Sequence, residues 1–195
     1  MNYKYENNTK LRIVLLLDKK TNSFVKKLNK EIGKDIRSDI IFSKKCLPHI
    51  TLVSGVLKNS SDFEKVCEIV ENEIINNFTK NLKIGFDGFY FSSNKNWLFL
   101  GLKDNKELTN FISNLREKLN EFFEISDARR LHITLAKSNE LISKQECICD
   151  LKIPNDCNFE NIAIGLSGKN GILENTIKKF KINNFHSVKS FDTSF

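Results

Sequence analysis

The sequence is poor in the features that mark disordered, secreted and membrane-spanning chains. It contains only two prolines and eight glycines in 195 residues, which argues against a disordered or low-complexity chain. The apolar run Leu11–Leu17 is far too short to cross a bilayer, and the first ten residues lack the apolar region of a signal peptide. We therefore expect no membrane association and a cytoplasmic protein, or a nuclear one if the source is eukaryotic.

Cysteine is scarce and its spacing does not match a metal site. Five cysteines are an odd number, and without a signal peptide they read as free thiols in a reducing compartment. Cys147, Cys149 and Cys157 lack the paired Cys-x-x-Cys spacing of structural zinc sites, and no nearby histidine completes a ligand set. We predict neither a metal nor a cofactor.

Positive charge is concentrated in the first third of the chain. The net charge is +7, and residues 1–58 hold 13 Lys and Arg against 5 Asp and Glu. Such a segment favours an anionic ligand by electrostatic steering, although a solvated lysine face gives the same composition.

Histidine occurs only three times, yet two of the three open the same tetrapeptide. His-Ile-Thr-Leu begins at His49 and again at His132. Ile, Thr and Leu favour strands, and strand alternation sends His and Thr to one face and Ile and Leu to the other. One histidine in an apolar strand is usually a packed residue, but packing has no reason to reuse His and Thr together. The pair therefore predicts two imidazoles and two hydroxyls, those of Thr51 and Thr134, facing one cleft.

The periodicity predicts an α+β fold with two similar halves. At 40% hydrophobic residues, including 16 phenylalanines, the chain is long enough to bury a substantial core. We expect a single bilobal domain over residues 1–195, with a core at about 11–182 and a loosely ordered tail at 183–195. The expected strands are 11–18, 39–42, a strand that follows Pro48, 82–91, 96–103, 130–137, 161–167 and 172–181. The expected helices are one capped by Thr21 or Asn22 that runs to about residue 36, 59–78 and 105–123, while 140–157 carries no clear pattern.

Paired imidazoles and hydroxyls suit the cleavage of a phosphodiester. One histidine takes a proton from the attacking hydroxyl or water, while the other donates one to the leaving oxygen. Hydroxyl groups two residues along each strand can donate hydrogen bonds to phosphate oxygens.

Two His-x-Thr motifs, separated by about half of the domain, resemble those of the 2H phosphoesterase superfamily, which includes 2′-5′ RNA ligase-like proteins and cyclic nucleotide phosphodiesterases. The resemblance runs from about residue 11 to residue 182, but only the two tetrapeptides are diagnostic. It implies a bilobal α+β fold, with antiparallel sheets lining a central cleft and helices outside. It also implies that His49 and His132 are the acid–base pair and that Thr51 and Thr134 bind phosphate.

Other residues are weaker candidates for binding the substrate. Arg129 and Arg130 precede the second motif and could clamp a phosphate, although surface ion pairs are an equal interpretation. Lys45 flanks the first motif and Lys137 ends the second, with the same ambiguity. Among Tyr90, Phe91 and Trp97, one aromatic ring could stack on a base and the others are expected in the core. His186 is expected to be a solvent-exposed residue of the tail.

The sequence thus predicts a monomeric, metal-independent phosphodiesterase for RNA or oligonucleotide ends, including 2′,3′-cyclic phosphates. A phosphodiesterase for 2′-5′-linked or cyclic oligonucleotide signals is the first alternative. An RNA 3′-end exonuclease, a non-catalytic module that binds RNA ends, and a structural domain whose histidine strands never meet remain open.

Overall fold

The computed structural model describes residues 8–43, 46–77, 82–127, 130–140, 142 and 152–182. The helical segments are α1 (Lys19–Asp35), η1 (Ser60–Asp62), α2 (Phe63–Asn77), α3 (Lys106–Leu119) and η2 (Lys169–Gly171). The strands are β1 (Lys10–Leu17), β2 (His49–Leu57), β3 (Lys83–Phe91), β4 (Trp97–Leu102), β5 (Phe123–Ile125), β6 (His132–Lys137), β7 (Asp156–Ser167) and β8 (Leu173–Lys181). Among the described residues, no helix is long and apolar enough to span a membrane.

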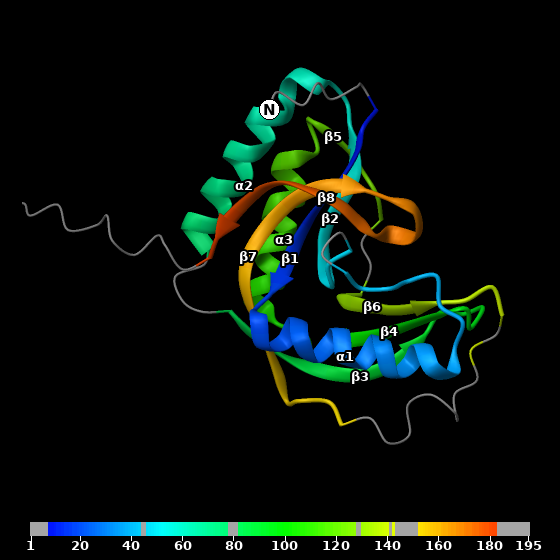
Figure 1. Cartoon of the computed structure of the whole chain (residues 1–195). Coiled ribbons are helices and arrows are strands. Elements are labelled where there is room, and N and C mark those ends of the chain that lie inside the picture. The colour runs from blue at the N-terminus through cyan, green and yellow to red at the C-terminus, as the bar shows by residue number, and fades with distance from the viewer. Residues whose placement is uncertain are drawn as a thin grey trace, which may run out of the picture.

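All strand pairs in the described chain are antiparallel, and the strands close on themselves in the order β1-β2-β6-β4-β3-β7, because β7 also pairs with β1. The first lobe consists of β5, β2, β1, the later part of β7, and β8. The second lobe consists of β6, β4 and β3 with the first residues of β7. The long strand β7 and the residue pair of Ile50 with Ile133 join the two lobes. This arrangement confirms the predicted bilobal α+β class (Figure 1).

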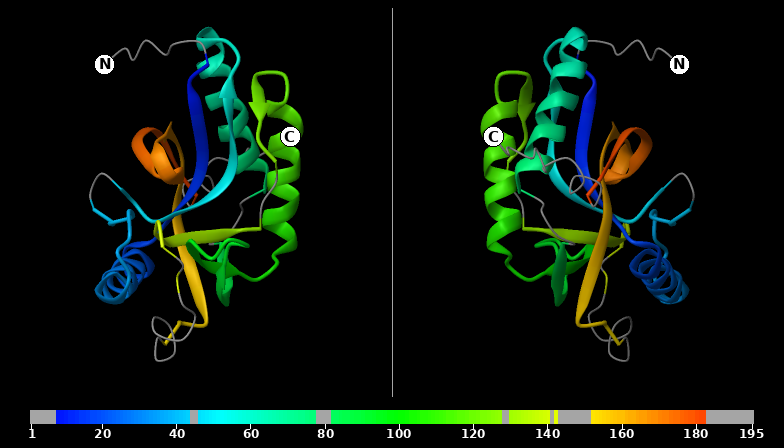
Figure 2. Two further views of the ribbon diagram at one scale, coloured as in Figure 1. Left: turned by 90° about the vertical axis from the view of Figure 1, so that its right-hand side faces the viewer. Right: turned by 90° about the vertical axis from the view of Figure 1, so that its left-hand side faces the viewer.

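Helix α1 covers the second lobe, and α3 covers the first. Helix α1 links two strands of the first lobe but packs mainly on β6 of the second lobe, whereas α2 and α3 pack together and α3 contacts β2. Figure 1 and the two side views of Figure 2 show α1 along the second lobe, away from α2 and α3. Each histidine strand therefore has a helix over its Ile/Leu face, and Ile50, Leu52, Ile133 and Leu135 are all buried.

The first helix begins earlier than predicted. Asp18, not Thr21 or Asn22, is its N-cap, and the Asp18 carboxylate accepts a hydrogen bond from the Thr21 amide at 2.8 Å. Because β1 ends at Leu17, Asp18 is the only residue between strand and helix. An aspartate in that place satisfies a backbone N–H of the first turn that has no partner within the helix.

The predicted strand at 39–42 is wrong. Backbone groups of this segment bond to the side chain of the buried Asn29 of α1 and form no strand. The Asn29 amide donates to the Ile40 carbonyl at 3.0 Å and to the Leu135 carbonyl at 2.7 Å, and its oxygen accepts from the Phe42 backbone N–H. Ile40 is buried and Phe42 packs against the core, while Ile41 between them is 75% exposed.

Three further boundaries of helices and strands differ from those that the periodicity predicts. Helix α3 ends at Leu119, and Phe123–Ile125 forms the short strand β5 beside β2, with Phe123 in the core. Strand β7 begins at Asp156 rather than at residue 161, because its first residues pair with β3. The helix expected from residue 59 begins with the 3₁₀ turn η1 before α2.

Candidate active site

The two copies of His-Ile-Thr-Leu meet where the lobes join. Ile50 and Ile133 form the only residue pair between β2 and β6 in the described chain. Both isoleucines are buried, and because successive side chains of a strand point to opposite faces, the residues on either side of each turn away from the core. His49, Thr51, His132 and Thr134 are all partly exposed, and all four line one cleft of about 550 Å³. The full lining comprises Arg12, His49, Thr51, Ser92, Asn94, Trp97, Phe99, His132, Thr134, Asn170 and Gly171.

Both imidazoles are oriented by the same backbone contact. Nδ1 of His49 lies 2.8 Å from the Leu47 carbonyl oxygen, and Nδ1 of His132 lies 2.7 Å from the Arg130 carbonyl oxygen. A carbonyl can only accept, so we assign the hydrogen to Nδ1 in both rings. In the neutral form of each ring, Nε2 then carries the lone pair that can take a proton.

Loss of hydration among the surrounding protein atoms lowers the pKa of His49 to about 4. The hydrogen bond to the Leu47 carbonyl opposes this shift, while the positive charges of Arg12 and His132 add to it. At neutral pH the ring is therefore uncharged, which is the form that a general base requires.

His132 lies among aromatic rings. Its ring centroid is 4.4 Å from that of Phe99 and 6.1 Å, edge to face, from that of Tyr90. The Arg130 guanidinium lies over the Tyr90 ring at 4.7 Å and pairs with Asp87. Burial raises the pKa of Tyr90 to about 12, so its phenol stays protonated.

The structure adds Arg12, which the sequence reasoning missed. Arg12 projects from β1, donates from Nη1 to the Thr51 hydroxyl at 3.0 Å and from Nε to the Ser167 hydroxyl at 2.8 Å. Because Thr51 accepts this bond, its own O–H is left to donate to a ligand. The available signal was a lone charge inside the otherwise apolar strand 11–17.

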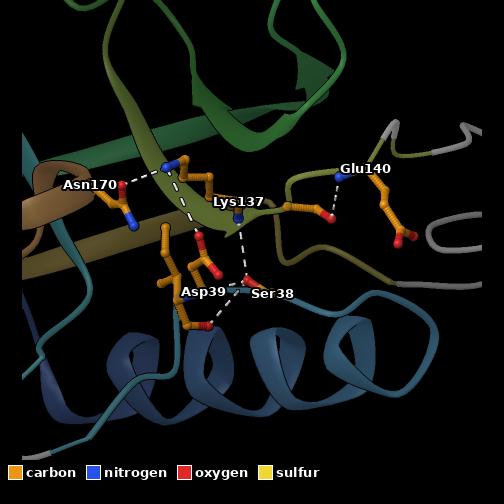
Figure 3. A network of polar contacts seen from close by, with 7 residues as sticks. Ser38, Asp39, Lys137, Glu140 and Asn170 are labelled. Atoms are coloured by element: carbon orange, nitrogen blue, oxygen red, sulfur yellow. Dashed lines mark hydrogen bonds and ion pairs between the residues drawn. The ribbon is translucent and has the colours of Figure 1, made fainter.

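Lys137, at the end of β6, holds one part of the rim of the cleft by its contact with Asn170 (Figure 3). Its Nζ donates to Asn170 Oδ1 at 2.6 Å, lies 3.9 Å from Asp39 Oδ2 and sits 5.3 Å from the centre of the Trp97 ring. The backbone N–H of Lys137 donates to Ser38 Oγ at 3.2 Å. These contacts fix η2 against the site.

The weaker candidates have different positions. Tyr90 contacts His132, and Arg130 lies beside it with its charge paired to Asp87. Lys45 and Arg129 lie outside the described residues, as do His186, Cys147, Cys149 and the tail 183–195.

Of the other two aromatic candidates, Trp97 lines the cleft and Phe91 packs against the core. Among the residues that the structure describes, no three His, Cys, Asp or Glu side chains gather closely enough to hold a metal ion.

The chemistry available in this cleft is proton transfer together with anion binding. Two imidazole Nε2 atoms can move protons, and two threonine hydroxyls with the Arg12 guanidinium can bind an oxyanion. Trp97 and Phe99, whose rings are nearly parallel at 6.1 Å, give the cleft an aromatic wall.

Comparisons with solved structures show the same fold. An E. coli LigT structure in complex with 3′-AMP has a TM-score of 0.58 at 12% identity, with 91% of this chain and all of that chain covered. The TT0787 protein of Thermus thermophilus has a TM-score of 0.61 at 12% identity, with 91% and 100% covered. A crystal structure described as that of a phosphoesterase has a TM-score of 0.58 at 12% identity, with 90% and 99% covered.

Sequence comparisons give the family. A search of curated proteins found no match. The family model of the AKAP7 2′5′ RNA ligase-like domain matches residues 13–192, a span that includes both histidine motifs and nearly every element of the fold. The chain therefore belongs to the AKAP7 2′5′ RNA ligase-like domain family, within the 2H phosphoesterase superfamily.

Proposed function

We propose that this protein is a metal-independent phosphodiesterase that cleaves ribonucleotide phosphodiesters at RNA or oligonucleotide ends, including 2′,3′-cyclic phosphates. The observation that carries the proposal is the convergence of His49 and His132 on one cleft, each with its Nδ1 held by a backbone carbonyl. We also propose that residues 1–195 act as one bilobal domain, because the site is made by both lobes.

His49 takes a proton on Nε2 from the attacking hydroxyl or water in the first step. Its lowered pKa keeps it neutral at physiological pH and so supports this role. The new oxygen–phosphorus bond forms as the bond to the leaving oxygen breaks, and His132 donates the proton that this oxygen needs. The roles exchange when a cyclic phosphate is then hydrolysed. Thr51, Thr134 and Arg12 stabilise the charge that develops on the phosphate oxygens.

Two observations support nucleotide binding: the aromatic side chains in the wall of the cleft, and the ligands of LigT, a protein of the same fold. Trp97 and Phe99 offer aromatic faces on which a base can stack, with about 1–3 kcal/mol expected for each stacked base. LigT, which shares the fold, has been crystallised with 3′-AMP, ATP and NADP+. All three are nucleotides, so we propose an RNA or oligonucleotide substrate.

A second candidate is a phosphodiesterase for 2′-5′-linked or cyclic oligonucleotide signals. The description of the matching family as 2′5′ RNA ligase-like favours this linkage. Both candidates use the same site and differ only in the strand that enters it. An RNA 3′-end exonuclease and a module that binds RNA ends without turnover are the remaining outcomes of the test.

The experiment is to incubate the protein with 2′,3′-cyclic, 2′-5′, 3′-5′ and cyclic oligonucleotides and to read the product termini by mass spectrometry. His49→Ala and His132→Ala are each expected to lower turnover roughly a hundred- to ten-thousand-fold while the fold and much of the ligand affinity persist. His186→Ala, which removes the histidine outside both motifs, should cleave like the parent.

Three results would contradict the proposal. Turnover equal to that of the parent in either motif variant would show that the histidines are not the catalytic pair. Complete loss of activity in excess chelator would contradict the metal-independent mechanism. Binding of an oligonucleotide without cleavage by the parent would identify a non-catalytic module.

A further inference from the structure

A second cavity adjoins the catalytic cleft, and the inference drawn from it rests on the proposed function. It has a volume of about 150 Å³ and shares Arg12, Thr51 and His132 with the larger cleft. Its lining comprises Lys10, Arg12, Thr51, Leu52, Ser54, Ile112, Arg116, Ser126, Asp127, Arg130, Leu131 and His132. The aromatic pair Trp97 and Phe99 lines only the larger cleft, so the two cavities differ in chemistry.

Positive charge gathers around this second cavity from three parts of the fold. Lys10 and Arg12 come from β1, Arg116 from α3, and Arg130 from the segment before β6. Asp127 is the only carboxylate among its described lining residues. One further carboxylate, that of Asp87, pairs with Arg130 from β3. The cavity therefore retains an excess of positive charge that favours an anion.

Two of the cations, Arg12 and Arg116, are placed by hydrogen bonds. Arg116 is partly buried, and its Nη2 donates to the Ser126 carbonyl at 3.0 Å, which anchors the guanidinium along the wall. Arg12 bonds Thr51 and lines both cavities, so it lies between the catalytic centre and the second cavity. Ser54 and Ser126 add hydroxyl groups to the same wall. Guanidinium and hydroxyl donors around a small space suit the oxygens of a phosphate group.

We propose that this second cavity is an anion subsite for the phosphate next in the chain to the one that is cleaved. A strand would then place a base against Trp97, the scissile phosphate between His49 and His132, and a neighbouring phosphate near Lys10 and Arg116. The substrate class is accordingly an oligonucleotide with at least two phosphate groups. A mononucleoside 2′,3′-cyclic phosphate has only one phosphate and leaves this subsite unused.

The test compares substrates that differ by one terminal phosphate. The dinucleotides ApA, pApA and ApAp, in 2′-5′ and 3′-5′ linkages, are cleaved under identical conditions and kcat/KM is measured. The wild-type protein should prefer pApA or ApAp over ApA by about tenfold or more, as expected for charge-assisted hydrogen bonds. Lys10→Gln/Arg116→Gln should bring this ratio close to one.

Matched variants separate charge from structure. Lys30→Gln/Arg37→Gln removes the same two charges from exposed positions outside both cavities and should keep the preference. Arg116→Lys loses the guanidinium hydrogen bond to the Ser126 carbonyl but keeps a positive charge at this position, and it should retain most of the preference. The preference should also weaken as salt concentration rises in the wild-type protein. If Arg116→Lys abolished the preference as fully as Lys10→Gln/Arg116→Gln, the anion subsite would be the wrong explanation.

Binding distinguishes failure of this inference from failure of the proposed function. Calorimetry with the His49→Ala protein measures affinity for the three dinucleotides without turnover. Tighter binding of pApA or ApAp supports the subsite even if no dinucleotide is cleaved by the parent, a result that would contradict the phosphodiesterase proposal alone. Equal affinity for all three dinucleotides in both linkages overturns the subsite and leaves the phosphodiesterase proposal standing.

Discussion

The two histidines of the site share one orientation and differ in their surroundings. In both, a carbonyl two residues earlier in the chain accepts from Nδ1, so Nε2 is the nitrogen available for proton transfer. His49 is desolvated and feels the charge of Arg12, whereas His132 lies against Phe99 and Tyr90. Identical tetrapeptides thus provide two imidazoles in different surroundings, and the proton affinity of His49 is set by neighbours that its tetrapeptide does not contain.

The first prediction concerns the pH dependence of catalysis. For cleavage of an oligonucleotide, whose first step uses neutral His49 as the base, kcat/KM should rise with pH through an apparent pKa of about 4. Arg12→Met removes a positive charge that lowers this pKa, so the acid limb of the profile should move to higher pH. Rates should also fall roughly a hundredfold, because Arg12 and the Thr51 hydroxyl it orients no longer act on the phosphate.

Arg37→Met, which removes an exposed cation outside the cleft, is the matched control and should leave the acid limb in place. An unchanged limb in Arg12→Met would contradict the electrostatic coupling between Arg12 and His49.

At the scale of elements, the positions of helices and strands with a regular apolar pattern can be predicted from the sequence. The conformation of segments that bond to residues far away in the chain cannot. The hairpin of β3 and β4, the end of β7 and the strand β8 lie close to where periodicity puts them. The segment at 39–42 is shaped by Asn29, and β5 exists because the edge of β2 is open beside it. Neither partner is visible in the local pattern.

A second prediction concerns Asn29, which is only 6% exposed and links α1 to β6. Asn29→Ala leaves the Ile40 and Leu135 carbonyls without this donor, so the free energy of unfolding should fall by about 2–3 kcal/mol. Asn114→Ala, on the exposed face of α3, should change it by less than about 0.5 kcal/mol. Denaturant unfolding measures both, and similar values for the two variants would contradict the role of Asn29.

For the whole molecule, the cleft exists because few strand contacts join the two lobes. Strand β7 continues from one lobe to the other, and within the described residues Ile50 with Ile133 is the only pairing of β2 with β6. Side chains that flank this junction on the outer face cannot be covered by a neighbouring strand, so they line a cavity. His49 lines this cavity but is partly buried by the protein atoms around it, and this partial loss of hydration lowers its pKa.

A third prediction follows for stability. The pKa of His49 is near its ordinary value of 6.5 in the unfolded state and about 4 in the folded protein. The unfolded state therefore binds more protons in this range, and the free energy of unfolding should fall by up to about 3 kcal/mol as pH drops from 6.5 to 4. His49→Asn should lack this part of the decline, which denaturant unfolding at several pH values measures. A constant difference between parent and variant across the range would contradict the lowered pKa.

The sequence by itself determined the class of fold and the proposed reaction centre. Strand alternation places His and Thr on one face and Ile and Leu on the other whatever the partner strand, and the burial of the two tetrapeptides in β2 and β6 follows that alternation. A repeated tetrapeptide is a local signal, so it can be read without knowing the tertiary structure.

Only the tertiary structure decided what surrounds those residues. Arg12 reaches Thr51 because β1 pairs with β2, and Asn170 reaches the rim because Lys137 holds it there. The cation-rich second cavity likewise combines β1, α3 and the approach to β6. Such contacts join residues far apart in the chain, and they depend on strand order and helix packing. The physical reason is that proton affinity and anion binding arise from burial and neighbouring charges, which exist only once the lobes have come together.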